Sequence, residues 1–179
     1  MVEPWTEYPD VWKTEAAFFS WLRGALRRAV WEKYPPKLIF KNENCHPPPE
    51  GYTGRAKSGN YCALSSDWEG KSKLEVDHII GNAQFKSWDD LLPFVEHLCA
   101  RGKKRGQEFQ LVTKEAHKIK SYAERQGIPY EEAVIAKKVI GICKGDDKQW
   151  LTERGVVPAS NLEKRKVQIR EVLMNASNS

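Results

Sequence analysis

The sequence lacks the cysteine pairs, the long apolar runs and the leader pattern that define several large classes of protein. Its four cysteines are scattered, and none belongs to a Cys-x-x-Cys pair, so neither a disulfide framework nor a zinc cluster is indicated. No apolar run approaches the ~18 residues needed to cross a bilayer. The N-terminus has no charged-then-apolar signal layout. We therefore expect a soluble, cytoplasmic protein with no membrane partner.

Length and composition predict one small domain with extensions. Of the 179 residues, 40% are hydrophobic, which is enough to bury a core. We divide the chain into an N-terminal helix with a Pro- and Gly-rich basic arm (1–59), a core (60–126) and a C-terminal helical extension (127–179).

The net charge of +5 is unevenly placed. Residues 101–125 hold eight Lys and Arg against three Glu, whereas residues 61–100 hold three basic residues against seven acidic ones. A basic segment of this kind attracts polyanions through counterion release. Charge by itself, however, is more typical of a solvated helix face.

Hydrophobic periodicity predicts an α+β fold that is mainly helical, with a helical insertion between two strands. Thr14, Ser87 and Thr113 are expected to cap helices, and Pro35-Pro36 to end the first. Gly81-Asn82 should end the first strand. We expect helices at 14–34, about 87–99, 113–126, 129–143 and 161–174, strands at 73–80 and 108–112, an extended arm at 41–60, a turn at 145–147 and a frayed tail at 175–179.

Two short segments carry residues suited to chemistry. The apolar strand 74–80 contains Asp77-His78, and the strand 108–112 runs into a basic helix with His117 in its first turn. An acid and two histidines brought together can hold one divalent metal and supply a general base, which is what phosphodiester hydrolysis requires. Taken alone, Asp77-His78 is more often a turn with a satisfied histidine, and His117 a surface residue. His46 is expected to be structural or exposed, and His97 to lie at a core edge.

The order Val76-Asp77-His78-Ile79-Ile80, then Gln110-Leu111-Val112-x-x-x-Ala116-His117-x-x-Lys120, resembles the HNH, or ββα-metal, endonucleases. It looks most like the tailed-phage branch that includes homing-type nucleases, over residues 60–122. The resemblance implies a ββα-metal core and a divalent-metal-dependent DNA endonuclease that nicks or cuts both strands. His78 would be the general base, and Asp77 and His117 would hold one Mg²⁺ or Mn²⁺ ion, or another transition metal that tolerates imidazole.

The chain departs from that family in two places. Glu108 stands where the family has Asn, so it could orient His78 as part of the catalytic site or could weaken the site. Where many relatives hold zinc through two Cys-x-x-Cys pairs, the segments 62–65 and 113–116 retain only Cys62. We therefore predict no structural zinc. The residues expected to fill that space are Tyr61, Leu64, Trp68 and Leu74.

Double-stranded DNA is the expected partner, contacted through its phosphates. The candidate contacts are Arg23, Arg27 and Arg28 on the first helix, Arg101, Lys103, Lys104 and Arg105 in a glycine-flanked loop, and Lys114, Lys118 and Lys120 on the helix with His117. One site per chain is consistent with a monomer or a weak homodimer, located in the host cytoplasm if the protein is phage-encoded.

Three hypotheses remain open at this point. The first is a metal-dependent DNA endonuclease. The second is a DNA-binding protein on an HNH scaffold whose catalysis has weakened or been lost, which Glu108 and the missing cysteines favour. The third is an unrelated basic domain, for example an RNA-binding or assembly protein. Asp77, His78 and His117 distinguish the first two from the third.

Overall fold

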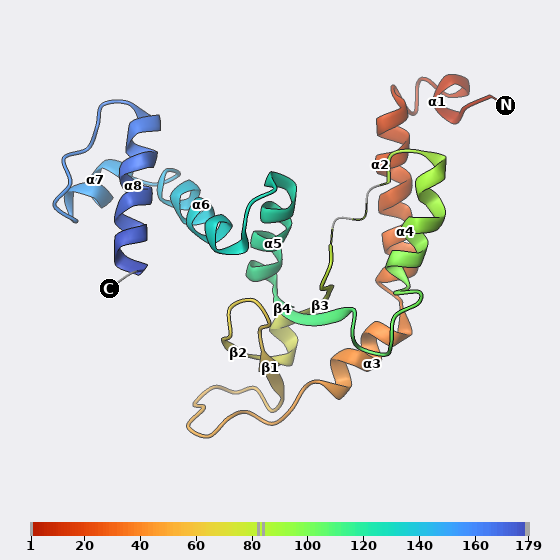
Figure 1. Cartoon of the computed structure of the whole chain (residues 1–179), viewed down its shortest axis with the longest axis horizontal. Coiled ribbons are helices and arrows are strands. Elements are labelled where there is room, and N and C mark those ends of the chain that lie inside the picture. Colours follow the sequence, from red (N-terminus) through yellow and green to blue (C-terminus); the bar gives the residue numbers. More distant parts are fainter. Residues whose placement is uncertain (1, 82, 84, 178–179) are drawn as a thin grey trace. The chain divides into compact units, whose positions relative to one another are not determined.

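The computed structural model describes residues 2–81, 83 and 85–177, and the chain forms two compact units, Met1–Ala116 and His117–Ser179 (Figure 1). About 53% of the described residues are helical and the strands form two small antiparallel sheets, which confirms the α+β class. The boundary between the units falls inside the segment 60–126, and the three-part division made from the sequence stays a prediction.

The helices and strands follow one another in a fixed order along the chain. They are α1 (Pro4–Glu7), α2 (Glu15–Leu26), η1 (Arg27–Trp31), α3 (Pro35–Glu43), β1 (Gly59–Tyr61), β2 (Trp68–Gly70), η2 (Lys71–Lys73), β3 (Leu74–His78), η3 (Trp88–Asp90), α4 (Leu91–Leu98), β4 (Phe109–Thr113), α5 (Lys114–Gln126), α6 (Tyr130–Ile142), α7 (Asp147–Thr152) and α8 (Leu162–Ser177).

The first long helix begins as predicted and ends in a π-helical turn. Thr14 caps α2 by accepting a hydrogen bond from the Ala17 amide at 3.2 Å. The α-helix then gives way to the π-helical turn η1, in which the Glu32 amide donates to the Arg27 carbonyl at 3.1 Å. The first helix ends before Pro35-Pro36, as predicted. The same two prolines also start α3, which was not predicted and is possible because proline at the first helical positions loses no intrahelical bond.

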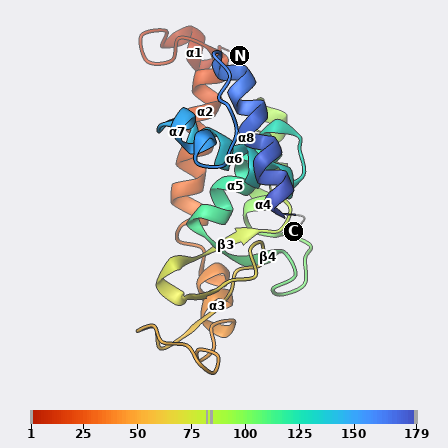
Figure 2. The ribbon, with the colours of Figure 1, turned by 90° about the vertical axis from the view of Figure 1, so that its left-hand side faces the viewer.

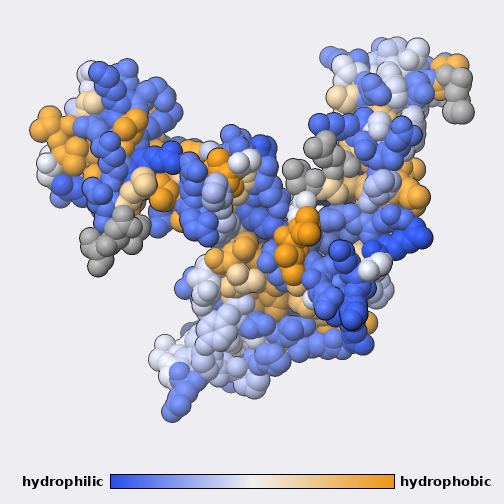
Figure 3. Space-filling model, in the orientation of Figure 1, coloured by the Kyte–Doolittle hydropathy of each residue, from blue (hydrophilic) through white to orange (hydrophobic). Residues whose placement is uncertain are grey.

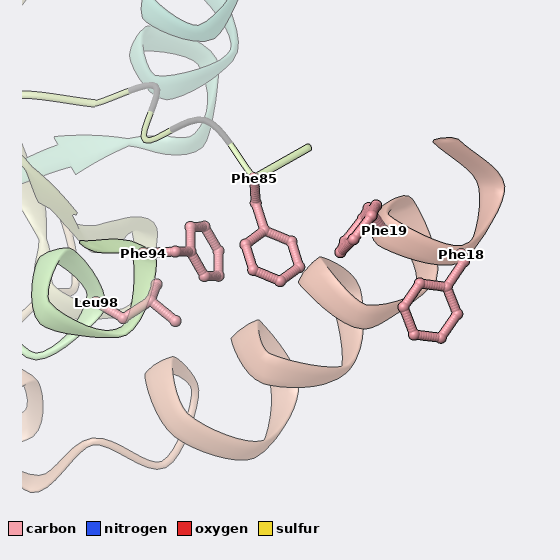
Figure 4. Packing of buried hydrophobic residues seen from close by; sticks show 5 residues of the cluster. All are labelled: Phe18, Phe19, Phe85, Phe94 and Leu98. Atoms are coloured by element: carbon pink, nitrogen blue, oxygen red, sulfur yellow. The ribbon is translucent and has the colours of Figure 1, made fainter. Parts of the chain in front are cut away.

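An aromatic core joins α2 to α4 within the first unit (Figure 4). Its buried members are Phe18, Phe19, Phe85, Phe94 and Leu98. Ser87 starts the helical insertion as predicted, through a reciprocal capping arrangement with Asp90. The insertion helix therefore has a capped start and a buried apolar face, and these two features hold it against α2.

The strands β3 and β4 pair antiparallel, with Leu74 opposite Thr113 and His78 opposite Phe109 (Figure 2). They confirm the two strands predicted at 73–80 and 108–112, although β3 ends at His78. Ile79 and Ile80 follow it and are 48% and 75% exposed. Gly81 continues the chain without regular structure, whereas Asn82 lies outside the described residues.

The small sheet of β1 and β2 was not predicted. It lies across the boundary expected between the arm and the core, and His46 extends it through a bridge to Gly59. A Cβ atom at Gly59 would lie 2.1 Å from the Glu69 carbonyl oxygen, so the close approach of the two strands requires glycine there. With α3 occupying residues 35–43, the segment 41–60 is less extended than expected.

The second unit has its own apolar core, formed by Val139, Leu151 and Ile169 from α6, α7 and α8. The turn expected at 145–147 lies between α6 and α7, where the Gly145 amide donates to the Ile142 carbonyl at 3.0 Å. Asp146 then caps α7 by accepting from the Gln149 amide at 3.0 Å, and Asp147 is already the first residue of that helix. The helix α8 runs to Ser177, so the tail is not frayed from 175 onward, and residues 178–179 lie outside the described residues.

Hydrophilic residues cover most of the visible face in the space-filling view, and apolar residues form separate patches (Figure 3). None of the helices that the structure describes has both the length and the apolar character needed to span a membrane.

Candidate active site

Asp77 and His78 lie at the end of β3, where both side chains are buried. The pairing of β3 with β4 places Asp77 opposite Gln110, and the Gln110 side-chain amide donates to the Asp77 carboxylate at 3.0 Å. This bond orients the carboxylate without neutralising its charge. The acid and the adjacent histidine therefore occupy defined positions at one end of the two-stranded sheet.

Three aromatic rings surround the imidazole of His78. Trp31, the last residue of η1, lies with its ring centroid 4.2 Å away at an interplanar angle of 33°. His97 from α4 lies at 4.4 Å and 30°, and Phe109 from β4 makes an edge contact at 5.4 Å and 73°. The ring of His78 is thus enclosed by residues from three separate elements.

Trp31 is itself held from another side by α3. The Lys37 ammonium lies 4.7 Å from the Trp31 ring centroid, and burial lowers the pKa of Lys37 from its ordinary value. The Tyr34 hydroxyl donates to the Cys99 carbonyl at 2.7 Å. This bond ties the segment after Trp31 to the end of the helix that carries His97. Burial is the main cause that raises the pKa of this hydroxyl from its ordinary value.

A pocket of about 280 Å³ opens beside His78 in the first unit. Acidic, basic and imidazole groups all border it, and Glu108 contributes a carboxylate atom, Oε2, that is buried and has no hydrogen-bond partner among the described residues. The lining residues are His78, Ile79, Ile80, Glu96, His97, Ala100, Arg101, Lys103, Gln107 and Glu108. Four residues predicted to be functional, His78, Glu108, Arg101 and Lys103, therefore meet at one cavity.

The main chain of Glu108 also supports the strand end. The Ile79 amide donates to the Glu108 carbonyl at 2.9 Å, which continues the ladder one step beyond His78. A bond of this kind is available to any residue at position 108, because it uses only the backbone. The structure thus gives the Glu108 main chain a positioning contact and places its side chain at the pocket.

The basic loop before β4 bends sharply at glycines 102 and 106, whose φ angles are +77° and +79°. Arg101 pairs with Glu96, and Arg105 pairs with Glu43. Both arginine side chains remain exposed, so these pairs are weak and their guanidinium groups stay accessible. Lys103 and Lys104 are exposed as well.

The other residues predicted to contact DNA differ in how exposed their side chains are. Arg27 and Arg28 are exposed on the π-helical turn, while Arg23 is half-buried. On α5, Lys114 and Lys118 are exposed, but Lys120 is only 9% exposed and its ammonium lies 3.5 Å from the Glu124 carboxylate. The position of Lys120 therefore gives its predicted DNA contact no support.

The segments 62–65 and 113–116 meet in an apolar cluster of Cys62, Val112 and Ala116, with Leu64 packed against it. Cys62 Sγ accepts a hydrogen bond from the Thr113 amide at 3.4 Å. Burial opposes ionisation of this thiol, but hydrogen bonds from the Ser65 side chain and nearby amides outweigh it and lower the pKa of Cys62.

Of the four residues expected to fill this space, only Leu64 packs there. Tyr61 is 55% exposed, so its assignment to the interior was wrong. Leu74 belongs to the cluster between the sheet and α3, and Trp68 contacts the ring of Tyr52.

The helix α5 begins directly after β4, and Thr113 caps it as predicted by accepting from the Ala116 amide at 3.1 Å. His117 follows in the first turn and is the first residue of the second unit. Among the described residues, no group of three or more His, Cys, Asp and Glu is placed to hold a metal ion. The pairing of Asp77 with His117 as metal ligands stays a prediction.

Two residues of the site were not found from the sequence. His97 does lie at a core edge, between the buried Phe94 and Leu98, but its contact with His78 was missed. The periodicity of α4 placed His97 beside the inward face, and that signal indicated burial without indicating a neighbour. Trp31 was not singled out, because nothing local marks a π-helical turn.

No family model matches this chain, and neither a curated protein nor a solved structure matches it.

Proposed function

We propose that the chain is a divalent-metal-dependent DNA endonuclease of the HNH type, with residues 60–126 as its ββα-metal (HNH) core. The observation that supports this proposal best is the shared pocket, where His78 meets Glu108, Arg101 and Lys103 at the end of β3. A base, an acid and two cations around one small cavity are suited to hydrolysing a phosphodiester.

His78 is proposed to take a proton from the attacking water. Neutral imidazole is suited to this step near neutral pH, because the ordinary pKa of histidine is ~6.5. The Glu108 carboxylate at the same pocket would stabilise the imidazolium that results. Arg101 and Lys103 would bind the phosphate, and an exposed Arg101–Glu96 pair can exchange its partner for a phosphate at little cost.

Asp77 and His117 would hold the divalent ion. Mg²⁺ commonly keeps several waters and takes only a few ligands from the protein, so a site with two protein ligands does not require a cluster of three. The carboxylate of Asp77, already oriented by Gln110, suits this role. When bound, the ion neutralises the negative charge that develops on the phosphate. No structural zinc is included in the proposal, because apolar packing occupies the region around Cys62.

The proposed substrate is double-stranded DNA, bound by a monomer or a weak homodimer in the cytoplasm. One site per chain cuts one strand, so cleavage of both strands requires a second chain or a second event. The exposed arginines of the loop and of η1 supply phosphate contacts that position the duplex.

Incubation of supercoiled plasmid with the purified full-length chain and Mg²⁺ or Mn²⁺ tests the proposal. Nicked or linear product, absent when EDTA is added, is the expected result. A chain that shifts DNA on a gel but leaves the plasmid intact with every divalent ion would instead be the DNA-binding protein without activity, the alternative that Glu108 favours. A chain that neither shifts nor cuts DNA would exclude both.

A further inference from the structure

Two aromatic side chains that the proposed chemistry does not use stack on the proposed base. The Trp31 and His97 ring centroids lie 4.2 Å and 4.4 Å from that of His78, and each ring is within about 33° of parallel to it. Both ring pairs are tilted and in close contact, and packed aromatic rings contribute attraction in addition to the burial of their surfaces. The imidazole is therefore held by two rings contributed by different helical segments.

Both rings are fixed by their own surroundings. His97 lies on α4 beside Phe94 and Leu98, which are 0% and 3% exposed in the aromatic core. Trp31 contacts the ring of Phe109 at 5.6 Å and the Lys37 ammonium at 4.7 Å. The stack thus connects His78 to two well-packed regions of the first unit.

An imidazole that acts as a general base must present one nitrogen to the attacking water in a narrow range of directions. Rotation about the two side-chain torsions of a histidine would spread that nitrogen over several orientations. A displacement of about 1 Å at a reacting group can cost ~100-fold in rate. Rings packed against the imidazole prevent these rotations, whatever hydrogen bonds its nitrogen atoms also make.

We propose that His97 and Trp31 are positioning residues that hold the His78 imidazole in its reactive orientation by stacking. The inference rests on the proposed nuclease function. For His97 the proposal attributes this positioning to the aromatic ring and not to protonation of the imidazole. A phenylalanine at position 97 should therefore hold His78 in its orientation, and a leucine of similar size should not.

The kinetic test compares His97→Phe with His97→Leu in the full-length chain on plasmid DNA. For His97→Leu we expect kcat to fall about 10- to 100-fold with little change in KM, whereas His97→Phe should retain most of kcat. His46→Leu makes the same chemical change at an exposed histidine outside the pocket and should leave kcat unchanged. Equal kcat for His97→Leu and wild type would overturn the proposal.

A spectroscopic test needs no DNA. In wild type and His97→Phe, the ring protons of His78 should be shifted upfield by the neighbouring ring, and in His97→Leu part of this shift should be lost. Trp31→Leu should lose the part of the shift that the Trp31 ring contributes, while Trp31→Phe should keep most of it. Circular dichroism and the thermal midpoint show which variants fold, and His97→Met replaces His97→Leu if that variant does not.

The kinetic and the spectroscopic test together distinguish failure of this inference from failure of the proposed function. If wild type cuts DNA but His97→Leu keeps both kcat and the upfield shift, the function stands and the positioning role is wrong. If wild type does not cut DNA with any divalent ion, the nuclease proposal fails. In that case loss of the shift in His97→Leu and its retention in His97→Phe would still support a stack that orients His78.

Discussion

The Ile79 amide donates a hydrogen bond to the Glu108 carbonyl at 2.9 Å, so the main chain of Glu108 holds the strand end that carries His78. The side chain of residue 108 is not needed for this contact. A glutamate at position 108 therefore leaves the backbone around His78 intact, and any effect of its side chain depends on the charge that it places at the pocket.

Replacing that charge gives the first prediction. Glu108→Gln keeps the shape of the side chain but removes the negative charge from the pocket of His78, whose imidazole would become positive in the proposed proton transfer. We expect cleavage to slow by roughly tenfold, equivalent to ~1.4 kcal/mol in the barrier, with the thermal midpoint almost unchanged. Plasmid-cleavage rates and thermal unfolding measure the two effects. Faster cleavage by Glu108→Gln would show that the carboxylate hinders the reaction.

The second prediction concerns His78, the proposed general base. His78→Ala should reduce cleavage by about 10²- to 10⁴-fold, the range for removal of a general base, and should spare DNA binding because the basic loop is untouched. Plasmid nicking and gel-shift assays measure the two properties. His46→Ala, at an exposed position outside the pocket, serves as the matched control. Undiminished cleavage by His78→Ala would remove His78 from the mechanism.

The third prediction concerns Lys103, one of the basic residues at the pocket, and the salt dependence of DNA binding. Lys103→Ala should weaken DNA binding and reduce the slope of log affinity against log salt by about 1, because one phosphate contact is lost. Binding is measured by fluorescence anisotropy across a salt series. Lys164→Ala removes one exposed charge from α8, outside the predicted contacts, and should not change the slope. An unchanged slope for Lys103→Ala would exclude a phosphate contact there.

Stability should depend on pH through the cap of the insertion helix. The Asp90 carboxylate accepts from the Lys86 amide at 2.8 Å and from the Ser87 amide and hydroxyl at 3.0 Å, and these bonds lower its pKa. Because the folded-state pKa is depressed, the stabilisation is complete above the ordinary aspartate pKa of ~3.9 and is lost as pH falls through the lower folded value.

The expected result is that Asp90→Asn unfolds at lower urea than wild type at neutral pH, with the difference shrinking in acid. Urea titrations of both chains between neutral and strongly acidic pH measure it. Asp89→Asn removes the same charge one residue away from the capping bonds and should lose less stability at neutral pH. A difference that is independent of pH would mean that the cap does not depend on the ionised carboxylate.

The second unit contains a nearly buried ion pair. Arg165 donates to the Asp147 carboxylate at 2.9 Å, and the two side chains are only 11% and 10% exposed. Asp147→Ala should lower the free energy of unfolding of this unit by about 3–5 kcal/mol, because it leaves an unpaired charge in the interior. The exposed pair of Lys166 with Glu163 is the comparison, and Lys166→Ala should cost less than ~1 kcal/mol. Denaturant titration and limited proteolysis measure the loss of stability in both variants. Equal losses for Asp147→Ala and Lys166→Ala would contradict the prediction that the buried pair contributes more than the exposed one.

Much of the framework was predictable because its signals are local. Alternation and an apolar run marked β3 and β4, and the hydroxyls of Thr14, Ser87 and Thr113 marked helix starts that the structure confirms. Local signals failed where one residue type serves two purposes. Pro35-Pro36 can end one helix and begin another, and the three-residue strands β1 and β2 are too short to show a period.

The sequence by itself determined the α+β class and the adjacency of Asp77 and His78, because strand periodicity and neighbouring positions are properties of a continuous segment. Only the tertiary structure decided which side chains surround His78. Trp31, His97 and Glu108 come from distant segments, and they meet because the aromatic core docks α4 on α2 while the strand pairing brings Glu108 beside Ile79. Ring stacking and pocket formation depend on that docking, and no local pattern encodes it.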